Sequence, residues 1–231
     1  MSTSVRKHFD GQLKDLNERM LKMASETEHS IKVTIKALTS KDTSELSSIV
    51  NGEALIDKLE RQIEGKCLKL LLQQQPVAKD LRTISSALKI ITDLERIADQ
   101  SIEIGEIILK LSFGKELSSD AKLNEIIYNI QLMATSSVRM VEESIVAYTE
   151  HDVSKANMII DADDCIDDYF VRIRDDIVKY IVTNNTQAIS ELCVDLLTIT
   201  KYLEKIGDHA VNIAEWVKFD VTGIHKDEKI L

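Results

Sequence analysis

The sequence predicts an all-α protein made of two tandem three-helix bundles that are related by an internal duplication. Its 231 residues include only one Pro and seven Gly, too few for a sheet protein with many turns. Apolar side chains recur at spacings of three and four over long stretches, the period of an amphipathic helix. Residues 94–106 are nearly repeated at 203–215, which indicates that one helical unit is used twice.

The first half of the chain predicts three helices. Apolar residues mark a long helix over 9–38, and the polar segment 39–43 ends it. A second helix follows up to residue 75, because Pro76 disfavours helical geometry in the residue before it. Pro76 suits the first turn of a third helix, which runs over 77–111. Three long helices joined by short loops must pack antiparallel to bury their apolar stripes.

The second half repeats this plan. Its three helices are marked by apolar residues over 123–148, 159–180 and 187–219. We expect the first bundle to span residues 1–114 and the second to span 115–220. The charged tail, 221–231, is expected to be frayed.

Composition excludes several classes of function. The formal charge of −10 and the absence of a basic cluster argue against direct binding of nucleic acid. The three cysteines are isolated, so they form neither a zinc motif nor a disulfide framework. The charged N-terminus does not resemble a signal peptide, and no apolar run could span a membrane. We therefore expect a soluble, cytoplasmic protein that does not insert into the membrane.

Acidic residues four positions apart occur at equivalent places in both repeats, each pair on one face of a helix. The pairs are Glu53 with Asp57, Glu95 with Asp99, Asp163 with Asp167, and Glu204 with Asp208. Two pairs fall on neighbouring antiparallel helices in each half, where their charges would repel without a cation between them. Oxygen donors suit Mg, Mn or Fe and also accept Zn. The pattern thus favours a metal site in each bundle.

The alternative interpretation is an ordinary solvated helix surface, with Arg96, Lys201 and Lys205 as local counterions. One acidic pair alone would favour that alternative, whereas four pairs in register favour metal. His209 could add a nitrogen ligand, although Gln100 stands at its equivalent position and a lone surface His is commonly just solvated. No nucleophile with a general base and no glycine-rich phosphate loop is present, so the sequence does not predict an enzyme.

Two segments resemble the duplicated signature of the PhoU family of bacterial phosphate-uptake regulators. They are Leu94-Glu95-Arg96-Ile97-Ala98-Asp99 and Leu203-Glu204-Lys205-Ile206-Gly207-Asp208-His209-Ala210. The resemblance covers almost the whole chain, from residue 9 to about residue 219, and implies two tandem three-helix bundles. It also implies multinuclear iron or zinc clusters held by the four acidic pairs named above. The first repeat departs from the family pattern, since Ala98 replaces the usual Gly and Gln100 the usual His.

The resemblance implies a protein that acts by contact. Its partners would be the ATPase subunit of the phosphate-specific ABC transporter and the sensor histidine kinase of the phosphate two-component system. We therefore expect a cytoplasmic, metal-binding adaptor that holds phosphate-starvation signalling off when phosphate is plentiful. One alternative is the accessory regulator of a low-affinity phosphate permease, and another is a carboxylate-bridged metalloenzyme such as a phosphatase or oxidase. The oligomeric state, including a homodimer, stays open.

Overall fold

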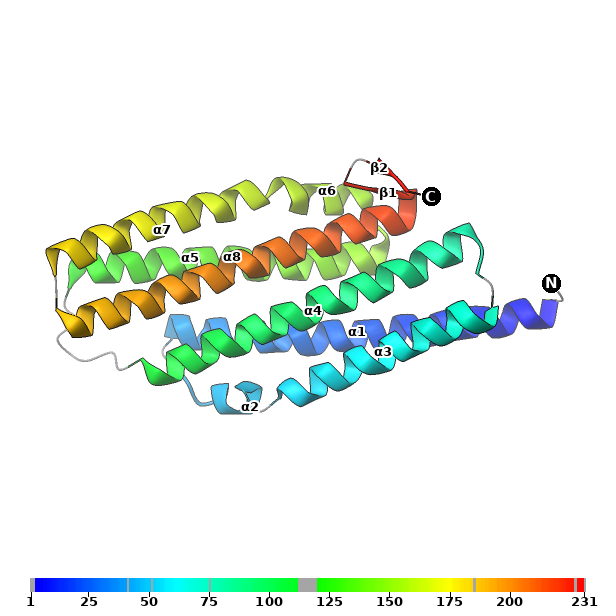
Figure 1. The fold of residues 1–231 in the computed structure, drawn as a ribbon, viewed down its shortest axis with the longest axis horizontal. Coiled ribbons are helices and arrows are strands. Elements are labelled where there is room, and N and C mark those ends of the chain that lie inside the picture. Colours follow the sequence, from blue (N-terminus) through cyan, green and yellow to red (C-terminus); the bar gives the residue numbers. More distant parts are fainter. Residues whose placement is uncertain are drawn as a thin grey trace.

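Helices account for nearly all of the structure, as the scarcity of Pro and Gly predicts (Figure 1). The computed structural model describes residues 3–40, 42–50, 52–74, 76–111, 120–184, 186–226 and 228–230. The first bundle contains α1 (Thr3–Ser40), α2 (Leu46–Val50), α3 (Glu53–Gln74) and α4 (Ala78–Lys110). The second contains α5 (Ala121–Glu150), α6 (Val153–Asp161), α7 (Asp163–Thr183) and α8 (Gln187–Thr222). Two short strands follow, β1 (Ile224–His225) and β2 (Glu228–Lys229). The predicted all-α fold with two repeats is confirmed.

The second and fifth helices are each broken in two, which corrects the expectation of continuous helices. Between α2 and α3 the N–H of Gly52 donates to the carbonyl of Ile49, at 2.8 Å, in a tight turn. Between α6 and α7 the N–H of Ala162 donates to the carbonyl of Ile159 at 3.1 Å. Such three-residue spacing winds the backbone more tightly than an α-helix does. The apolar spacing of seven continues across each break, so hydrophobic periodicity could not reveal it.

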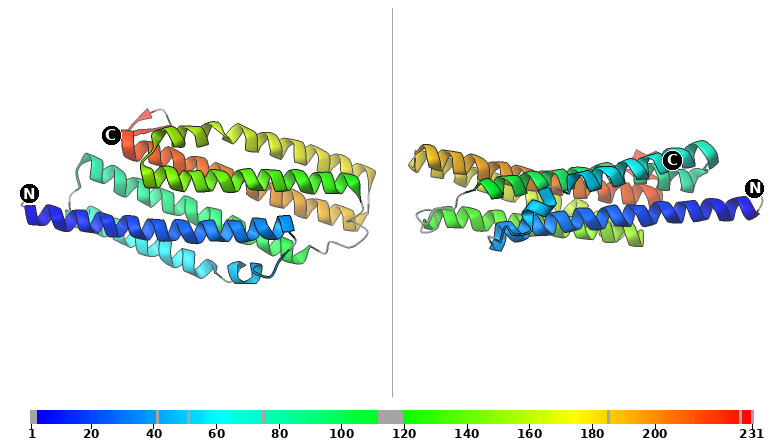
Figure 2. Two further views of the ribbon diagram at one scale, coloured as in Figure 1. Left: turned by 180° about the vertical axis from the view of Figure 1, so that it is seen from behind. Right: turned by 90° about the horizontal axis from the view of Figure 1, so that it is seen from below.

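The two bundles lie side by side, and the equivalent helices α4 and α8 run in opposite directions along their junction (Figures 1 and 2). Thr83 Oγ1 donates to Asp220 Oδ1 at 2.7 Å, and further along Asp93 Oδ1 lies 2.8 Å from His209 Nδ1. Residue numbers thus rise on one helix as they fall on the other. Equivalent helices in opposite directions relate the bundles by an approximate two-fold axis. The boundary expected at residue 114 lies outside the described residues.

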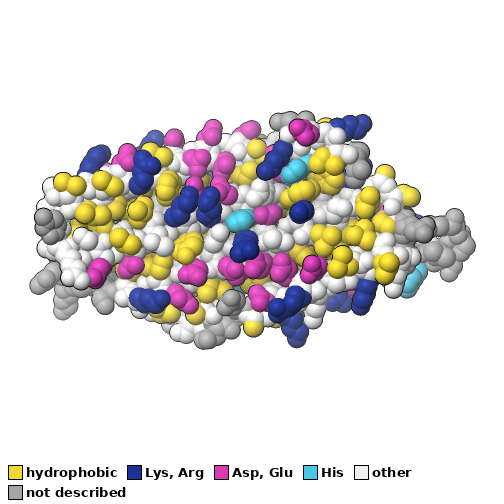
Figure 3. Space-filling view, in the orientation of Figure 1, with side chains coloured by type: hydrophobic (Ala, Val, Ile, Leu, Met, Phe, Trp, Pro, Cys, Tyr) yellow, Lys and Arg dark blue, Asp and Glu magenta, His cyan; other side chains and the backbone are white. Residues whose placement is uncertain are grey.

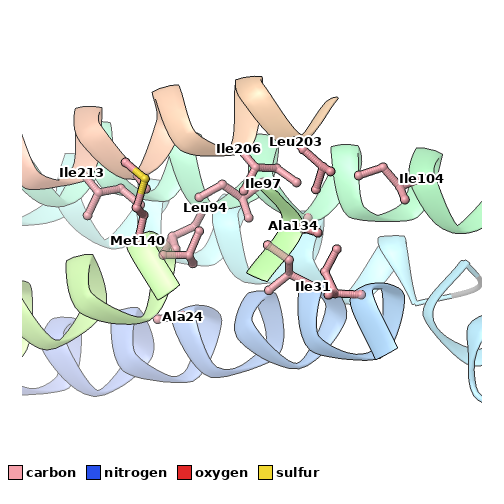
Figure 4. Packing of buried hydrophobic residues seen from close by; sticks show 14 of the residues in the cluster. Ala24, Ile31, Leu94, Ile97, Ile104, Ala134, Met140, Leu203, Ile206 and Ile213 are labelled. Carbon is pink, nitrogen blue, oxygen red and sulfur yellow. The ribbon is translucent and has the colours of Figure 1, made fainter. Parts of the chain in front are cut away.

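One hydrophobic core serves both bundles. Leu94 and Ile97 from α4 lie beside Leu203 and Ile206 from α8, with Ile31 of α1 nearby (Figure 4). Each of these five side chains is at most 1% exposed. The cluster of buried residues is continuous from α1 to α8. Burial at the junction is therefore as complete as burial within either bundle, which favours folding of the two as one unit.

The C-terminal tail folds back onto α8, so the expectation of a frayed tail was wrong for its described residues. Gly223, with a φ of 79°, ends α8 in the left-handed conformation that glycine adopts without strain. β1 then pairs with β2, and the ring of His225 stacks on that of Trp216 with centroids 3.9 Å apart. Glu215 Oε2 accepts the N–H of Lys226 at 3.1 Å. These contacts offset the lack of apolar periodicity in the tail.

Candidate functional site

The repeated motif is fixed in the same way in both bundles. Thr27 Oγ1 on α1 donates to the carbonyl of Leu94 at 3.3 Å, and Ser137 Oγ on α5 donates to that of Leu203 at 3.2 Å. Both leucines are buried, which fixes how each motif is rotated about its helix axis. The acidic residues that follow each leucine are partly exposed. They lie near α3 in the first bundle and α7 in the second.

The second acidic cluster consists of Asp163 and Asp167 on α7 with Glu204 and Asp208 on α8. Burial raises the pKa of Asp163 to about 6, and the charges of Asp208, Asp167 and Glu204 add to this rise, together with that of adjacent Asp164. Asp163 Oδ1 is buried and has no hydrogen-bond partner among the described residues. Carboxylates from two helices therefore converge here, as the sequence predicts, and one of their buried oxygens lacks a hydrogen-bond donor among the described residues.

The first acidic cluster is arranged differently. Burial raises the pKa of Glu95 to about 7, and repulsion from Asp99 and Glu60 adds to this, while Arg96 opposes it. Burial also raises the pKa of Glu60, with contributions from Glu64 and Asp57. Glu60 could not be predicted from the duplication, because its equivalent in the second repeat is Phe170. Asp57 lies 3.7 Å from Arg61, and the side chain of Glu53 lies outside the described part of the chain.

Basic side chains neutralise part of both clusters. Lys201 pairs with Glu204, and Lys205 pairs with Asp208 and also lies 3.6 Å from Glu204. In the first bundle, Arg96 Nε lies 3.5 Å from Glu95. Figure 3 shows acidic side chains along the middle of one face, over α3 and α4, and a second group over α7 and α8 with basic side chains beside it. The three basic residues that the alternative interpretation names as counterions therefore lie beside the acidic side chains.

The acidic pairs fit a metal chemically but do not form a complete coordination site in this structure. Carboxylate oxygens are the donors that hard cations prefer, and the buried oxygen of Asp163 has no hydrogen-bond partner among the described residues. Among the described residues, no three His, Cys, Asp or Glu side chains lie close enough together to hold one ion. The lysine ammonium groups supply the positive charge instead.

His209 contacts the other bundle. Its Nδ1 lies 2.8 Å from Asp93 Oδ1 on α4, and Asn212 Nδ2 donates to the same oxygen at 3.4 Å. Asp93 is largely buried, so the contact is a polar bridge across the junction. The duplication did not point to Asp93, because Tyr202 stands at its equivalent position.

Both repeats match one known domain. The sequence pattern described as the PhoU domain matches residues 20–108 and again residues 130–217. The chain belongs to the PhoU family. A phosphate-specific transport system accessory protein PhoU homolog of Clostridium acetobutylicum is 32% identical over 96% of this chain and 98% of its own length. PhoU proteins of this kind are named as accessory or regulatory proteins rather than enzymes, which agrees with the expectation from sequence.

Solved PhoU structures share the fold. That of PhoU from Pseudomonas aeruginosa superposes with a TM-score of 0.84 at 27% identity, covering 93% of this chain and 99% of that one. The phosphate transport system regulatory protein PhoU from Streptococcus pneumoniae gives 0.81 at 26% identity, covering 96% and 99%. In the described part of this PhoU chain, every helix is too short or too polar to cross a membrane.

Proposed function

We propose that this protein regulates phosphate uptake in the cytoplasm as an adaptor. It would link the ATPase subunit of the phosphate ABC transporter to the phosphate-sensing histidine kinase and hold starvation signalling off when phosphate is plentiful. The observation that carries the proposal is the match of both repeats to PhoU domains, together with nearly full-length similarity to phosphate-transport accessory proteins. The excess of acidic side chains suits docking onto basic partner surfaces, where opposite charges speed encounter.

A deletion strain tests the regulatory role. With phosphate in excess, a phosphate-starvation reporter should be switched on in the deletion strain and off again when the chain is supplied in trans. The purified chain should also retain the transporter ATPase subunit and the kinase from defined mixtures. A silent reporter in the deletion strain would overturn the proposal. A silent reporter with altered flux through a low-affinity permease would favour the permease accessory role instead.

We also propose that the acidic clusters bind metal cations. The residues would be Glu53, Asp57, Glu95, Asp99, Asp163, Asp167, Glu204 and Asp208, with His209 as an additional candidate. Support comes from the raised pKa values of Asp163 and Glu95, because a cation would offset both the burial that chiefly raises them and the repulsion that adds to it. Family resemblance favours Fe or Zn, and the oxygen donors also suit Mn or Mg.

Elemental analysis of the purified protein tests the metal proposal. We expect at least one ion per chain in the wild type and a clear loss in the Glu204→Ala, Asp208→Ala double variant. A matched control is Glu191→Ala with Asp195→Ala, an acidic pair with the same spacing on the same helix outside the cluster. Equal metal content in all three proteins would mean that the acidic clusters are ordinary solvated helix surfaces.

A further inference from the structure

A basic pocket lies at the junction of the two bundles, away from the acidic clusters. It has a volume of about 510 Å³, and its lining residues come from the N-terminal half of α1, the first turns of α4 and the ends of α5 and α8. Figures 1 and 2 show the course of these four helices. Its charged lining residues are Lys14, Lys79, Arg82, His151 and Asp220. Three permanent cations thus face one carboxylate in a chain whose formal charge is −10. This volume is within the usual range for small-molecule sites.

The carboxylate in the pocket is already engaged. Asp220 is buried, its Oδ1 accepts a hydrogen bond from Thr83 Oγ1 at 2.7 Å, and its Oδ2 lies 3.2 Å from His151 Nδ1. The carbonyl of the same residue accepts Arg82 Nε at 3.1 Å. Asp220 therefore holds the side chains of Arg82 and His151 in position. Its carboxylate contacts Thr83 and His151.

The remaining cationic groups are available to a ligand. Among the described residues no acidic side chain forms an ion pair with Arg82 or Lys79, and Lys14 has only Glu18 at 3.9 Å. Because Arg82 is bound through Nε, the two terminal nitrogens of its guanidinium remain to face an anion. Burial also raises the pKa of Tyr148, which lines the pocket and stays a protonated hydroxyl able to donate a hydrogen bond.

The charge is specific to this end of the molecule. The positions equivalent to Lys14, Lys79 and Arg82 in the other repeat carry Asn124, Ala188 and Glu191. The duplication therefore does not require cations here, and packing does not require the two lysines, since Lys14 and Lys79 are exposed, whereas Arg82 also joins α4 to α8 through Asp220. Leu13, Leu16 and Val221 add an apolar wall beside the charged one.

We infer that this pocket binds a small phosphate-bearing anion. Guanidinium and ammonium groups converging on one cavity are the donors that phosphate groups prefer. Inorganic phosphates would use the charged wall alone, whereas a nucleotide would also cover the apolar wall. The inference uses only the lining residues and stands whether or not the chain regulates phosphate uptake.

Calorimetric titration in EDTA, with inorganic phosphate, pyrophosphate and ATP as separate probes, tests this inference. We expect saturable binding of at least one probe, weakened by added salt, and the tightest probe identifies the source of the phosphate group. Arg82→Ala should weaken binding about tenfold, because it removes charge-assisted hydrogen bonds. The double variant Lys14→Glu, Lys79→Glu changes only exposed side chains, and it should abolish binding without harming the fold.

Lys22→Ala is the matched control, an exposed lysine on α1 outside the pocket. It should bind the probes as the wild type does. The inference is overturned if none of the three probes binds below about 1 mM, or if the Lys14→Glu, Lys79→Glu protein binds as tightly as the wild type.

Discussion

The two bundles share their packing and differ in their charges. Thr27 and Ser137 make the same hydrogen bond to the leucine carbonyl that opens each motif. Around the acids, however, the first bundle adds Glu60 and two arginines, Arg96 near Glu95 and Arg61 near Asp57. The second bundle instead carries two lysines that pair with Glu204 and Asp208. The duplication has kept the interactions that place the carboxylates and has not kept those that neutralise them. The two clusters proposed to bind metal therefore differ in the basic side chains that a cation would have to displace.

The two motifs also differ in one small residue. Gly207 in the second motif is Ala98 in the first, and a Cβ at Gly207 would lie 3.3 Å from Ile166 Cγ2 on α7. That distance is tighter than ordinary van der Waals contact, so α7 and α8 approach each other closely beside the second acidic cluster. Gly207 therefore allows a close approach of α8 to Ile166 next to Asp208.

The largest expected effect tests whether the two bundles are one folding unit. Ile97 and Ile206 are 0% exposed at equivalent positions in the shared core. Replacing either with Ala should lower the free energy of unfolding by about 3 kcal/mol, through lost burial and the cavity left behind. Urea titration followed by helical circular dichroism should give one transition for each variant, shifted by similar amounts. Two transitions would show that the bundles unfold separately.

The features that occur in both repeats could be predicted from the sequence. The long helices and the convergence of Asp163 with Asp208 followed from apolar spacing and from pairs in register. Glu60 and Asp93 could not be predicted, because each acidic residue occurs in one repeat only. The interactions of both side chains depend on which helix packs against them. The break at Ala162 escaped because the apolar period runs through it. Local periodicity does not predict which residues come into contact when they lie far apart in the sequence.

Opposite exchanges at one motif position should have unequal effects. Ala98→Gly removes a buried methyl group and raises backbone entropy in the unfolded chain, so it should cost about 2 kcal/mol. Gly207→Ala gains helix propensity, but the new methyl group pushes on Ile166, so stability should stay within about 1 kcal/mol of the wild type. Urea midpoints measure both changes. Equal losses in the two variants would mean that α7 and α8 cannot adjust.

Asp163 and Glu95, one from each acidic cluster, should titrate in different pH windows. Below pH 3.8 the folded and unfolded chains both hold the Asp163 proton, and as the pH rises to about 6 only the unfolded chain releases it. Stability therefore falls across that window and stays lower above it. In EDTA at pH 7, Asp163→Asn should be more stable than the wild type by about 1 kcal/mol, allowing for partial solvent screening, with no difference at pH 3.

For Glu95 the corresponding window runs from 4.5 to about 7. Glu95→Gln should therefore gain its stability over the wild type at higher pH than Asp163→Asn does. Exposed Glu191→Gln is the control and should show neither gain. A gain that is independent of pH would contradict the assignment of these effects to proton release.

The smallest expected effect concerns the ends of the equivalent helices. Leu111 follows the last residue of α4, and its N–H donates to carbonyls in the last turn of that helix. A glycine follows α8 and leads into the hairpin. His225→Ala removes the ring stacked on Trp216. This change should lower the free energy that holds the tail against α8 by about 1 kcal/mol. Because Trp216 is the single tryptophan, its emission should move to longer wavelength while the urea midpoint barely changes. Lys229→Ala, an exposed change in β2, should leave the emission where it is. Unchanged emission in His225→Ala would mean that the hydrogen bond from Lys226 to Glu215 holds the hairpin without the stack.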